Sequence, residues 1–347
     1  MEELVIFDDN EFLARMRDTA EPYLMARRED VWFTRRPGEK LHGVLYRADG
    51  NEQNPVKGTV VVAHGFTESA EKYREVAYLF LQHGYSCALI DHRGHGHSYR
   101  EVPQGPLTHV GRFEDYVQDL LYFARFIGAK KQMEKPLFLF SHSMGGCIAA
   151  GALEADPGLF QKAILSSPML SIRLNNLPEP PTYVAATLMS LLGQRKRSVT
   201  GEVFKPEANF AASCDTCEQR YLYYHELCVQ DPYLQNCSPT FGWVQASIRA
   251  TRDVRRPENC RRIKAPVLLF SAEKDIWVTE RGQREFIRRV PKGLFFRMSH
   301  TKHEIFMSKR PVLQLYWQRI FAFLEGQENQ KYLRARKVRS QKARLVR

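Results

Sequence analysis

Some common features are missing from this sequence of 347 residues, and each absence narrows what the protein can be. No apolar run reaches the roughly 18 residues that a membrane-spanning helix needs, so we expect no transmembrane segment. Residues 1–10 are acidic and lack the basic start and apolar stretch of a secretion signal. No internal repeat is visible along the chain. We therefore expect a globular cytoplasmic protein with one large domain or two medium-sized ones.

Cysteine is scarce and odd in number, with seven residues in all. Without a secretion signal, an odd count favours reduced thiols over a disulfide framework. Cys214 and Cys217 form a C-x-x-C pair, and Cys228 and Cys237 follow, which suggests zinc. The second pair has neither C-x-x-C nor H-x-x-x-H spacing, and aromatic residues separate the four cysteines. We expect buried free thiols and no metal, and stoichiometric zinc in a metal analysis would overturn that.

The positive charge is unevenly distributed. The net charge is +12, and residues 327–347 hold eight Lys or Arg and one Glu, which leaves about +5 for the rest. A basic body would indicate a nucleic-acid groove, whereas a basic tail indicates an anionic surface partner or a solvated end. We expect no nucleic-acid partner. Among anionic partners, the inner leaflet of the membrane ranks first, which would make the protein peripheral on that membrane.

Buried strands alternate with helices over most of the chain. Strands are predicted at 58–63, 85–90, 137–141, 163–168, 266–272 and 293–297, and helices at 73–83, 114–127, 147–153, 279–290 and 311–325. Residues 30–35 and 40–47 are typical of an antiparallel hairpin that turns at Pro37-Gly38. Continuous apolar strands in βα alternation predict a doubly wound, mostly parallel sheet.

The alternation stops in the middle of the chain. Residues 170–255 contain prolines, aromatics and four of the seven cysteines, without a βα rhythm. We interpret this block as a lid inserted into a discontinuous core of residues 1–169 and 256–326, followed by the basic tail 327–347. Apolar runs such as 184–192 could line a substrate site, but we expect most of these residues to form the lid's own core, with only some of them facing an acyl chain.

One stretch carries the strongest sign of chemistry. The apolar strand 137–141 is followed at once by Ser143, then by Gly145 and Gly146 and a small-residue helix. Strand, sharp turn with a serine, and helix make the nucleophile elbow of an α/β-hydrolase. The usual pattern is Gly-x-Ser-x-Gly, and here Ser141 stands at the first glycine, a small residue that still lets strand and helix approach. The alternative is a helix capped by Ser143 without chemistry.

Two further residues fall where a nucleophilic serine would need them. A serine hydroxyl needs a base, and the base needs a supporting carboxylate. Asp275 follows strand 266–272 and His303 follows strand 293–297, so the order serine, aspartate, histidine is that of an α/β-hydrolase. Glu273 is a rival acid and His300 a rival base.

Backbone amides must also meet the oxyanion of the reaction. The amide after the nucleophile belongs to Met144, and the turn His64-Gly65 after strand 58–63 can supply the amide of Phe66. The alternative for His64-Gly65 is a plain tight turn.

These motifs together resemble the monoglyceride lipase and lysophospholipase branch of the α/β-hydrolase superfamily, and within it the bacterial L2 lysophospholipases. The resemblance covers about residues 30–325. It rests on His64-Gly65, the loop 91–98, the elbow 141–146, His303-Glu304 and, in the insertion, residues 219–221, 231–232 and 240–247. It implies an α/β-hydrolase fold with a helical lid.

The resemblance also implies roles for single residues. Ser143 would be the nucleophile, Asp275 the orienting acid and His303 the base, while Phe66 and Met144 would donate to the oxyanion. The loop 91–98 would brace the floor of the site. Its histidines, His92, His95 and His97, have no evident carboxylate or cysteine partners, so we expect a structural loop rather than a metal site.

The predicted activity is that of a serine esterase acting on a single-acyl lipid. Through an acyl-enzyme on Ser143, the protein would release a fatty acid from a lysophospholipid, without a cofactor. The alternatives are a monoacylglycerol lipase or general carboxylesterase, a thioesterase or perhydrolase, and a non-catalytic scaffold. A dehalogenase would need a carboxylate where Ser143 stands. Head group, chain length and oligomeric state are not determined by the sequence.

Overall fold

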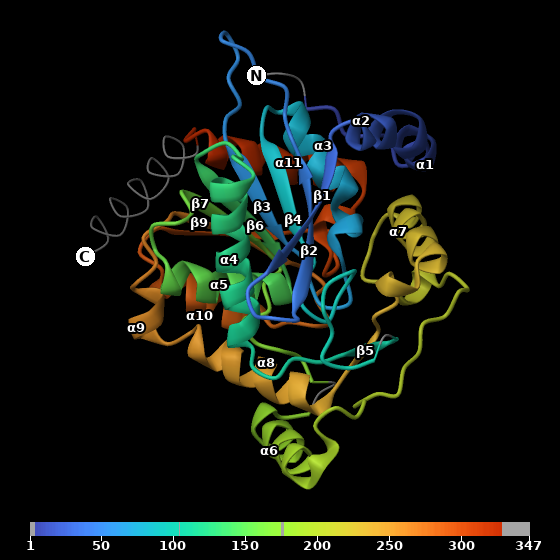
Figure 1. Cartoon of the computed structure of the whole chain (residues 1–347), viewed down its shortest axis with the longest axis vertical. Helices are drawn as coiled ribbons and strands as arrows, with labels where there is room; N and C mark the ends of the chain where they lie inside the picture. The colour runs from blue at the N-terminus through green and yellow to red at the C-terminus, as the bar shows by residue number, and fades with distance from the viewer. Residues whose placement is uncertain (1–3, 104, 175–176, 328–347) are drawn as a thin grey trace, which may run out of the picture.

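An eight-stranded sheet forms the centre of the computed structural model, which describes residues 4–103, 105–174 and 177–327 (Figure 1). The strand order is β1-β2-β4-β3-β6-β7-β9-β10. The strands are β1 (Arg28–Thr34), β2 (Lys40–Tyr46), β3 (Thr59–Ala63), β4 (Ser86–Ile90), β6 (Leu137–His142), β7 (Lys162–Ser166), β9 (Val267–Ala272) and β10 (Gly293–Met298). All six predicted core strands are therefore present within a residue or two of their expected bounds.

The sheet is parallel except at one edge. β1 and β2 pair antiparallel as the predicted hairpin, and β2 pairs antiparallel with β4. The pairs from β4 through β10 are all parallel. The hairpin turns at Gly38, whose φ of 79° is a conformation that glycine adopts without steric cost. This confirms the predicted mostly parallel sheet.

Helices cover both faces of the sheet. One apolar core lies under α4 (Glu114–Lys130), α5 (Met144–Ala155) and α10 (Glu280–Arg289). The other lies under α3 (Arg74–Gln82) and α11 (Arg310–Leu324). The middle strands are buried along their whole length because both faces are covered, which explains why their sequences are apolar throughout rather than alternating.

Short helices complete the core. They are α1 (Phe12–Arg15), η1 (Met16–Ala20), α2 (Glu21–Met25), η2 (Ala70–Tyr73), α9 (Pro257–Cys260) and η6 (Ile305–Met307). The chain before β1 thus contains three short consecutive helical segments, α1, η1 and α2.

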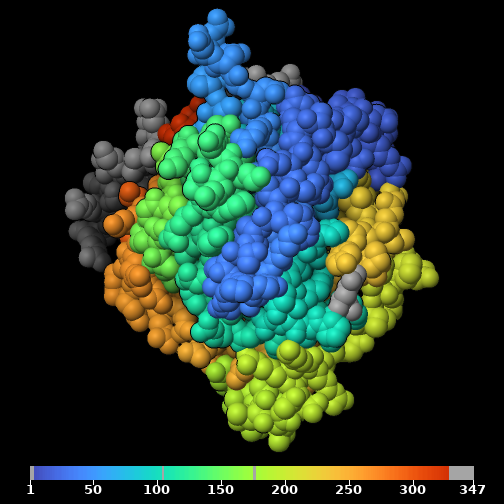
Figure 2. Space-filling model, in the orientation of Figure 1, coloured from blue at the N-terminus to red at the C-terminus, as the bar shows by residue number. Residues whose placement is uncertain are grey.

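The inserted block is mostly helical. It contains α6 (Glu179–Met189), η3 (Ser190–Gln194), η4 (Phe210–Ala212), α7 (Glu218–Gln230), η5 (Pro232–Leu234), β8 (Ser238–Pro239) and α8 (Phe241–Asp253). We call residues 170–255 the cap. β8 pairs with β5 (Leu107–Thr108) of the core, a contact that the sequence did not predict. In Figure 2 the segment around α6 projects from the lower end of the molecule. The division into core and cap stays our interpretation.

The strand order changes direction at the centre of the sheet, between β3 and β6. β3 is followed along the chain by its neighbour β4 on one side, whereas β6 is followed by β7 on the other. In open α/β sheets, ligands bind at the carboxyl ends of strands at such a switch point. Among the described residues, no helix combines the length and the apolar character that crossing a bilayer requires. The predicted basic tail lies beyond residue 327, outside the described residues.

Candidate active site

Ser143 lies in a sharp turn between β6 and α5. Its φ of 48° and ψ of −115° are a strained conformation for a residue with a side chain. Its carbonyl accepts the N–H groups of Gly146 and Met169, which hold the turn in place. A Cβ at Gly145 would lie 2.1 Å from the carbonyl oxygen of Ala63, so a larger residue does not fit there. This is the geometry of a nucleophile elbow.

Ser141 stands where the motif usually has its first glycine. Its side chain is buried and donates to the carbonyl of Ile164 in β7 at 3.2 Å. A hydroxymethyl group therefore fits this position with its polar atom satisfied, as a small residue was expected to do.

The structure brings together Ser143, His303 and Asp275, which are far apart in the sequence. His303 Nε2 lies 2.8 Å from Ser143 Oγ, and His303 Nδ1 lies 2.7 Å from Asp275 Oδ2. Asp275 Oδ1 accepts two backbone N–H groups, from Trp277 and Val278, each at 2.9 Å. Serine, base and carboxylate thus form one continuous hydrogen-bonded chain of the kind that activates a serine hydroxyl.

The surroundings tune both titratable groups of this chain. Burial acts to lower the pKa of His303, but the Asp275 carboxylate outweighs it, so the pKa lies above the ordinary value. Burial acts to raise the pKa of Asp275, yet His303 and the two backbone N–H groups hold it below its usual value. The pair is therefore arranged so that the carboxylate stays ionised while the imidazole accepts and returns a proton.

The two rival residues contact each other instead of the serine. Glu273 Oε2 accepts the backbone N–H of His300 at 2.8 Å. Glu273 also lies near Arg297, and the side chain of His300 is exposed. Neither residue contacts Ser143 or His303 among the described interactions. The geometry favours Asp275 and His303.

The two predicted oxyanion donors come from different elements, the loop after β3 and the start of α5. The N–H groups of Phe66 and Met144 have no acceptor among the described residues. The N–H of Gly65, next to Phe66, donates to the buried Glu68 at 2.6 Å, which fixes the loop after β3. The ring of Phe66 packs on Trp243 of cap helix α8 with centroids 4.2 Å apart. Core and cap therefore both hold the loop that carries the predicted oxyanion donor.

Buried charged residues behind the site were missed by the sequence analysis. Glu68 and Lys72 are 4% and 9% exposed, and they form an ion pair at 3.1 Å. Lys72 also pairs with Glu304, the neighbour of His303. His142, next to the nucleophile, contacts Glu68 at 3.1 Å. The four-residue spacing of Glu68 and Lys72 was the one available signal, but such pairs usually lie on solvated helix faces.

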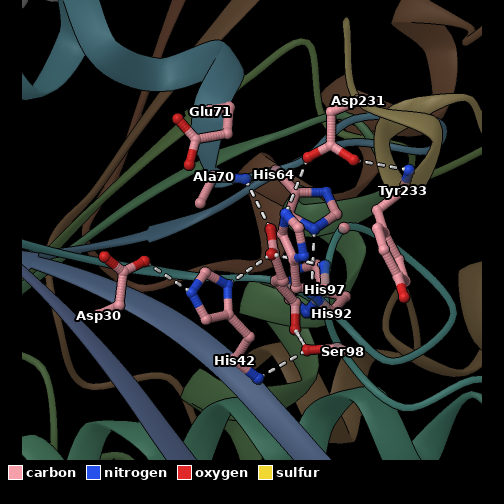
Figure 3. Close-up of polar contacts among 12 residues, drawn as sticks. Asp30, His42, His64, Ala70, Glu71, His92, His97, Ser98, Asp231 and Tyr233 are labelled. Atoms are coloured by element: carbon pink, nitrogen blue, oxygen red, sulfur yellow. Dashed lines mark hydrogen bonds and ion pairs between the residues drawn. The ribbon is translucent and has the colours of Figure 1, made fainter. Parts of the chain in front are cut away.

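The loop 91–98 is a hub of polar contacts. Figure 3 shows His42 between two carboxylates, with its Nδ1 2.8 Å from Asp91 and its Nε2 2.9 Å from Asp30. Asp91 also accepts the N–H groups of Ala70 and His97. These contacts tie β1, β2, η2 and the loop together beneath the site. They support the predicted structural role for the loop.

One expectation about this loop was wrong. His97 was expected to lack a carboxylate partner, but its Nε2 lies 2.9 Å from Asp231 at the end of cap helix α7 (Figure 3). The two residues are 134 positions apart, so only the packing of the cap on the core reveals the pair. Within the described residues, no group of three or more His, Cys, Asp or Glu side chains is arranged to hold a metal ion.

The four cap cysteines have separate environments rather than a common centre. All four are free thiols. Cys214 accepts the indole N–H of Trp277, and Cys217 accepts from Arg220 of α7. Burial raises the pKa of the Cys228 and Cys237 thiols to about 11. These contacts give no support to the zinc interpretation of the C-x-x-C pair.

The cap exposes many apolar side chains. Leu191 and Leu192 in η3 are 79% and 72% exposed, and Val184 and Leu188 of α6 are about half exposed. Because these residues gather on the projecting segment seen in Figure 2, they are available to an apolar partner such as an acyl chain or a lipid surface. The expectation that most of the run 184–192 forms the lid's own core was therefore wrong, because most of these side chains are exposed.

Comparisons with known proteins agree with this geometry. A family model described as "Serine aminopeptidase, S33" matches residues 54–310. A "Probable lysophospholipase L2" of Haemophilus influenzae is 29% identical over 85% of this chain and 94% of its own. Lysophospholipase L2 of Escherichia coli K12 is 30% identical over 75% of this chain and 74% of its own. A soluble variant of monoglyceride lipase from Saccharomyces cerevisiae, solved with a substrate analogue, superposes with a TM-score of 0.65 at 19% identity, over 87% of this chain and 96% of its own.

Proposed function

This chain belongs to the serine aminopeptidase S33 family and to the lysophospholipase and monoacylglycerol lipase branch of the α/β-hydrolases, and from that premise we propose that it is a lysophospholipase. The family and its curated relatives make the chain a serine ester hydrolase, which sets aside the non-catalytic scaffold. The observation that carries the proposal is the hydrogen-bonded chain from Ser143 through His303 to Asp275 at the strand ends.

In the first half of the proposed reaction, Ser143 Oγ attacks the carbonyl carbon of the single acyl ester. His303 Nε2 takes the hydroxyl proton as the C–O bond forms, and Asp275 stabilises the resulting imidazolium. The N–H groups of Phe66 and Met144 donate to the oxyanion of the tetrahedral intermediate. His303 then returns the proton to the departing glycerol oxygen, and the acyl group stays on Ser143.

In the second half, water replaces the alcohol. His303 removes a proton from the water as its oxygen attacks the acyl carbon, and the same proton goes back to Ser143 Oγ when the acyl–serine bond breaks. The products are a fatty acid and the deacylated head-group alcohol. Every proton is carried by His303, so the residues present account for the reaction without a cofactor.

The substrate class rests on the cap and on the relatives. Both curated relatives named above are lysophospholipases L2, and the exposed apolar residues of α6 and η3 offer an acyl chain or a lipid surface an apolar contact. We place the substrate site between the cap and Ser143. A monoacylglycerol has the same acyl ester with an uncharged head group, so a monoacylglycerol lipase is the alternative.

A substrate panel tests the proposal. Purified protein is given lysophosphatidylcholine, lysophosphatidylethanolamine, monoacylglycerol and short p-nitrophenyl esters, with Ser143→Ala as the control. We expect fatty acid release from the lysophospholipids to exceed release from monoacylglycerol, and no release by the variant. Preference for monoacylglycerol would replace the proposed activity by the alternative. Failure of a fluorophosphonate probe to label intact protein at Ser143 would contradict the serine mechanism itself.

Contact with an anionic membrane through the basic residues 327–347 stays part of this proposal, as does a cytoplasmic location. Eight Lys or Arg in that segment would attract anionic lipid by about 1 kcal/mol each near the surface. Flotation with vesicles of phosphatidylglycerol and phosphatidylethanolamine tests the contact. We expect full-length protein to bind at low salt and a chain ending at residue 326 to bind less. Equal binding of the two would contradict a role for the tail.

A further inference from the structure

A buried cluster of charges joins the loops of the site to the cap. It consists of Glu68, Lys72, Asp215 and Glu304, which come from three separate parts of the chain. None of the four was given a role in the reaction above. Burying charged groups is unfavourable unless they are paired, so a cluster of this size needs a reason.

Glu68 holds the loop that carries the predicted oxyanion donor. Its Oε2 accepts the backbone N–H of Gly65 and the hydroxyl of Tyr73, both at 2.6 Å. Its carboxylate also lies 3.1 Å from His142 Nδ1 and 3.1 Å from Lys72 Nζ. One carboxylate therefore contacts the loop after β3, the residue before the nucleophile, and the lysine.

Lys72 continues this link to the catalytic base. Its ammonium group lies between Glu68 and Glu304, and Glu304 directly follows His303 in the chain. Burial acts to lower the pKa of Lys72, but Glu304 and Glu68 raise it above its usual value, so the lysine stays charged. The lysine thus bridges the loop of Phe66 and the loop of His303.

The cap adds the last member of the cluster. The carbonyl of Cys214 accepts the N–H of Glu304 at 3.3 Å, and the N–H of Cys217 donates to the carbonyl of Met307 at 3.3 Å. Asp215 lies between these two contacts and is 4% exposed. Burial raises the pKa of the Asp215 carboxyl well above its usual value, and the charge of Glu304 raises it further.

The same cap segment also contacts the loop of the supporting acid. Cys214 Sγ accepts the indole N–H of Trp277, two residues after Asp275, at 2.7 Å. Lys302, just before His303, donates to the carbonyl of Ser213 at 2.9 Å. Residues 213–217 therefore rest on both loops that carry the base and its carboxylate.

We propose that Lys72 is a positioning residue that, through Glu68 and Glu304, locks the oxyanion loop to the loop of His303, and that Asp215 of the cap completes this lock. The inference rests on the proposed function, because it assigns the lock to the same Ser143 site. The cap thereby acts on the chemistry itself, in addition to any contact with the acyl chain.

The lock also sets the electrostatic surroundings of His303. The charged or titratable groups around His303 are Asp275 from the loop after β9, Glu68 from the loop after β3, His142 from β6, Lys72 from η2, Glu304 beside it, and Asp215 from the cap. Lys72 is the cation that pairs with both Glu68 and Glu304, whereas Lys302, just before His303, binds the carbonyl of Ser213 instead. The loss of Lys72 leaves Glu68 and Glu304 uncompensated, and both favour the protonated imidazole.

The test is Lys72→Met, assayed for hydrolysis of p-nitrophenyl butyrate between pH 5 and 9. A short soluble ester is used because it does not depend on lipid binding. We expect kcat to fall about 10-fold with KM within about 2-fold, since orientation of the base is lost. The acid limb of kcat/KM should move up by about one pH unit, because negative charge left near His303 raises its pKa.

Three further variants separate positioning from general damage. Lys72→Arg keeps the charge and should restore the position of the limb. In Lys72→Met/Glu304→Gln the uncompensated charge is reduced, so the limb should return toward the wild-type position. Lys162→Met removes a half-buried lysine whose ammonium group binds the carbonyls of Phe323 and Leu324, at the opposite end of β7, and should leave the limb in place.

Asp215 has its own pair of variants. Asp215→Asn keeps the shape of the side chain without its charge and should retain activity, whereas Asp215→Ala removes the buried side chain and should lower kcat. If Lys72→Met does not fold, Glu304→Gln alone should shift the limb downward, and an unmoved limb there would overturn the inference. Wild-type hydrolysis with an unmoved limb in Lys72→Met would overturn this inference alone. A wild-type protein that hydrolyses none of the esters would overturn the proposed function, and this inference with it.

Discussion

Replacing Asp275 by asparagine tests the supporting acid with little change of shape. In the structure, one carboxylate oxygen accepts the N–H groups of Trp277 and Val278, and the other accepts from His303 Nδ1. An asparagine would keep its carbonyl oxygen toward the two backbone N–H groups, because its NH₂ group cannot accept from them. Its NH₂ group would then face His303 Nδ1.

That arrangement gives the histidine the wrong tautomer. A donor facing Nδ1 makes Nδ1 the acceptor and leaves the hydrogen on Nε2, which then points at Ser143 Oγ. The base could no longer take the serine proton. In the serine-protease triad the same exchange lowers kcat about 10⁴-fold, which corresponds to roughly 5.5 kcal/mol of transition-state stabilisation. We expect a loss of about 10³- to 10⁴-fold here, with little change in KM.

The matched control is Glu273→Gln, the same carboxyl-to-amide change two residues away. Glu273 bonds the N–H of His300 rather than His303, so this variant should stay within about 2-fold of wild type. Both variants are assayed with p-nitrophenyl butyrate, and thermal unfolding by circular dichroism shows that each is folded. Activity of folded Asp275→Asn within 10-fold of wild type, or an equal loss in Glu273→Gln, would refute the assignment of the acid.

Three other outcomes follow from the structure. In the wild-type pH profile, kcat/KM should fall as the pH drops through the pKa of His303, because the base must be neutral to accept a proton. The midpoint should lie above the ordinary value of 6.5, and a midpoint below 6 would contradict this. Gly145→Ala should abolish soluble folded protein or activity, because its Cβ would lie 2.1 Å from the carbonyl oxygen of Ala63, and wild-type activity would contradict that geometry. Arg220→Met should lower the free energy of unfolding by about 3–5 kcal/mol, because it leaves the buried carboxylate of Glu75 without the arginine that lies 2.8 Å away. Urea titrations measure this, and a loss below about 1 kcal/mol would contradict the burial of the pair.

Most of the core fold could be predicted because its signals are local. The strands β3, β6 and β9 are continuous apolar runs, and each is buried along its whole length in the structure. The cap gave no such signal. Its segments are short and partly exposed, and β8, the one strand among the described cap residues, is only two residues long and pairs with residues 107–108 of the core. Such a pairing depends on tertiary packing rather than on a sequence pattern.

The closeness of Ser143, Asp275 and His303 could be predicted for a geometric reason. Parallel strands bring their carboxyl ends to one edge of the sheet, so residues that follow β6, β9 and β10 must lie near each other. Ser143 could also be chosen as the candidate nucleophile from local sequence alone, because the glycines that follow it are typical of a nucleophile elbow. The choice of Asp275 over Glu273 was harder, since the two residues are only two positions apart and both follow the same strand. The distances to His303 now favour Asp275.

The sequence by itself determined where the core strands lie, that most of them run parallel, and which candidate residues follow their carboxyl ends, because these are local patterns along the chain. The order of the strands in the sheet came only from the structure. Only the tertiary structure decided which polar side chains are buried. Lys72, Glu304 and Asp215 look like ordinary surface charges in the sequence, and His97 looks unpartnered. Packing of the cap on the core removes water from these residues and joins pairs more than 130 positions apart, such as His97 and Asp231. The interaction energy of a charged group depends on its burial and on the charges near it, and both are set only in the folded chain.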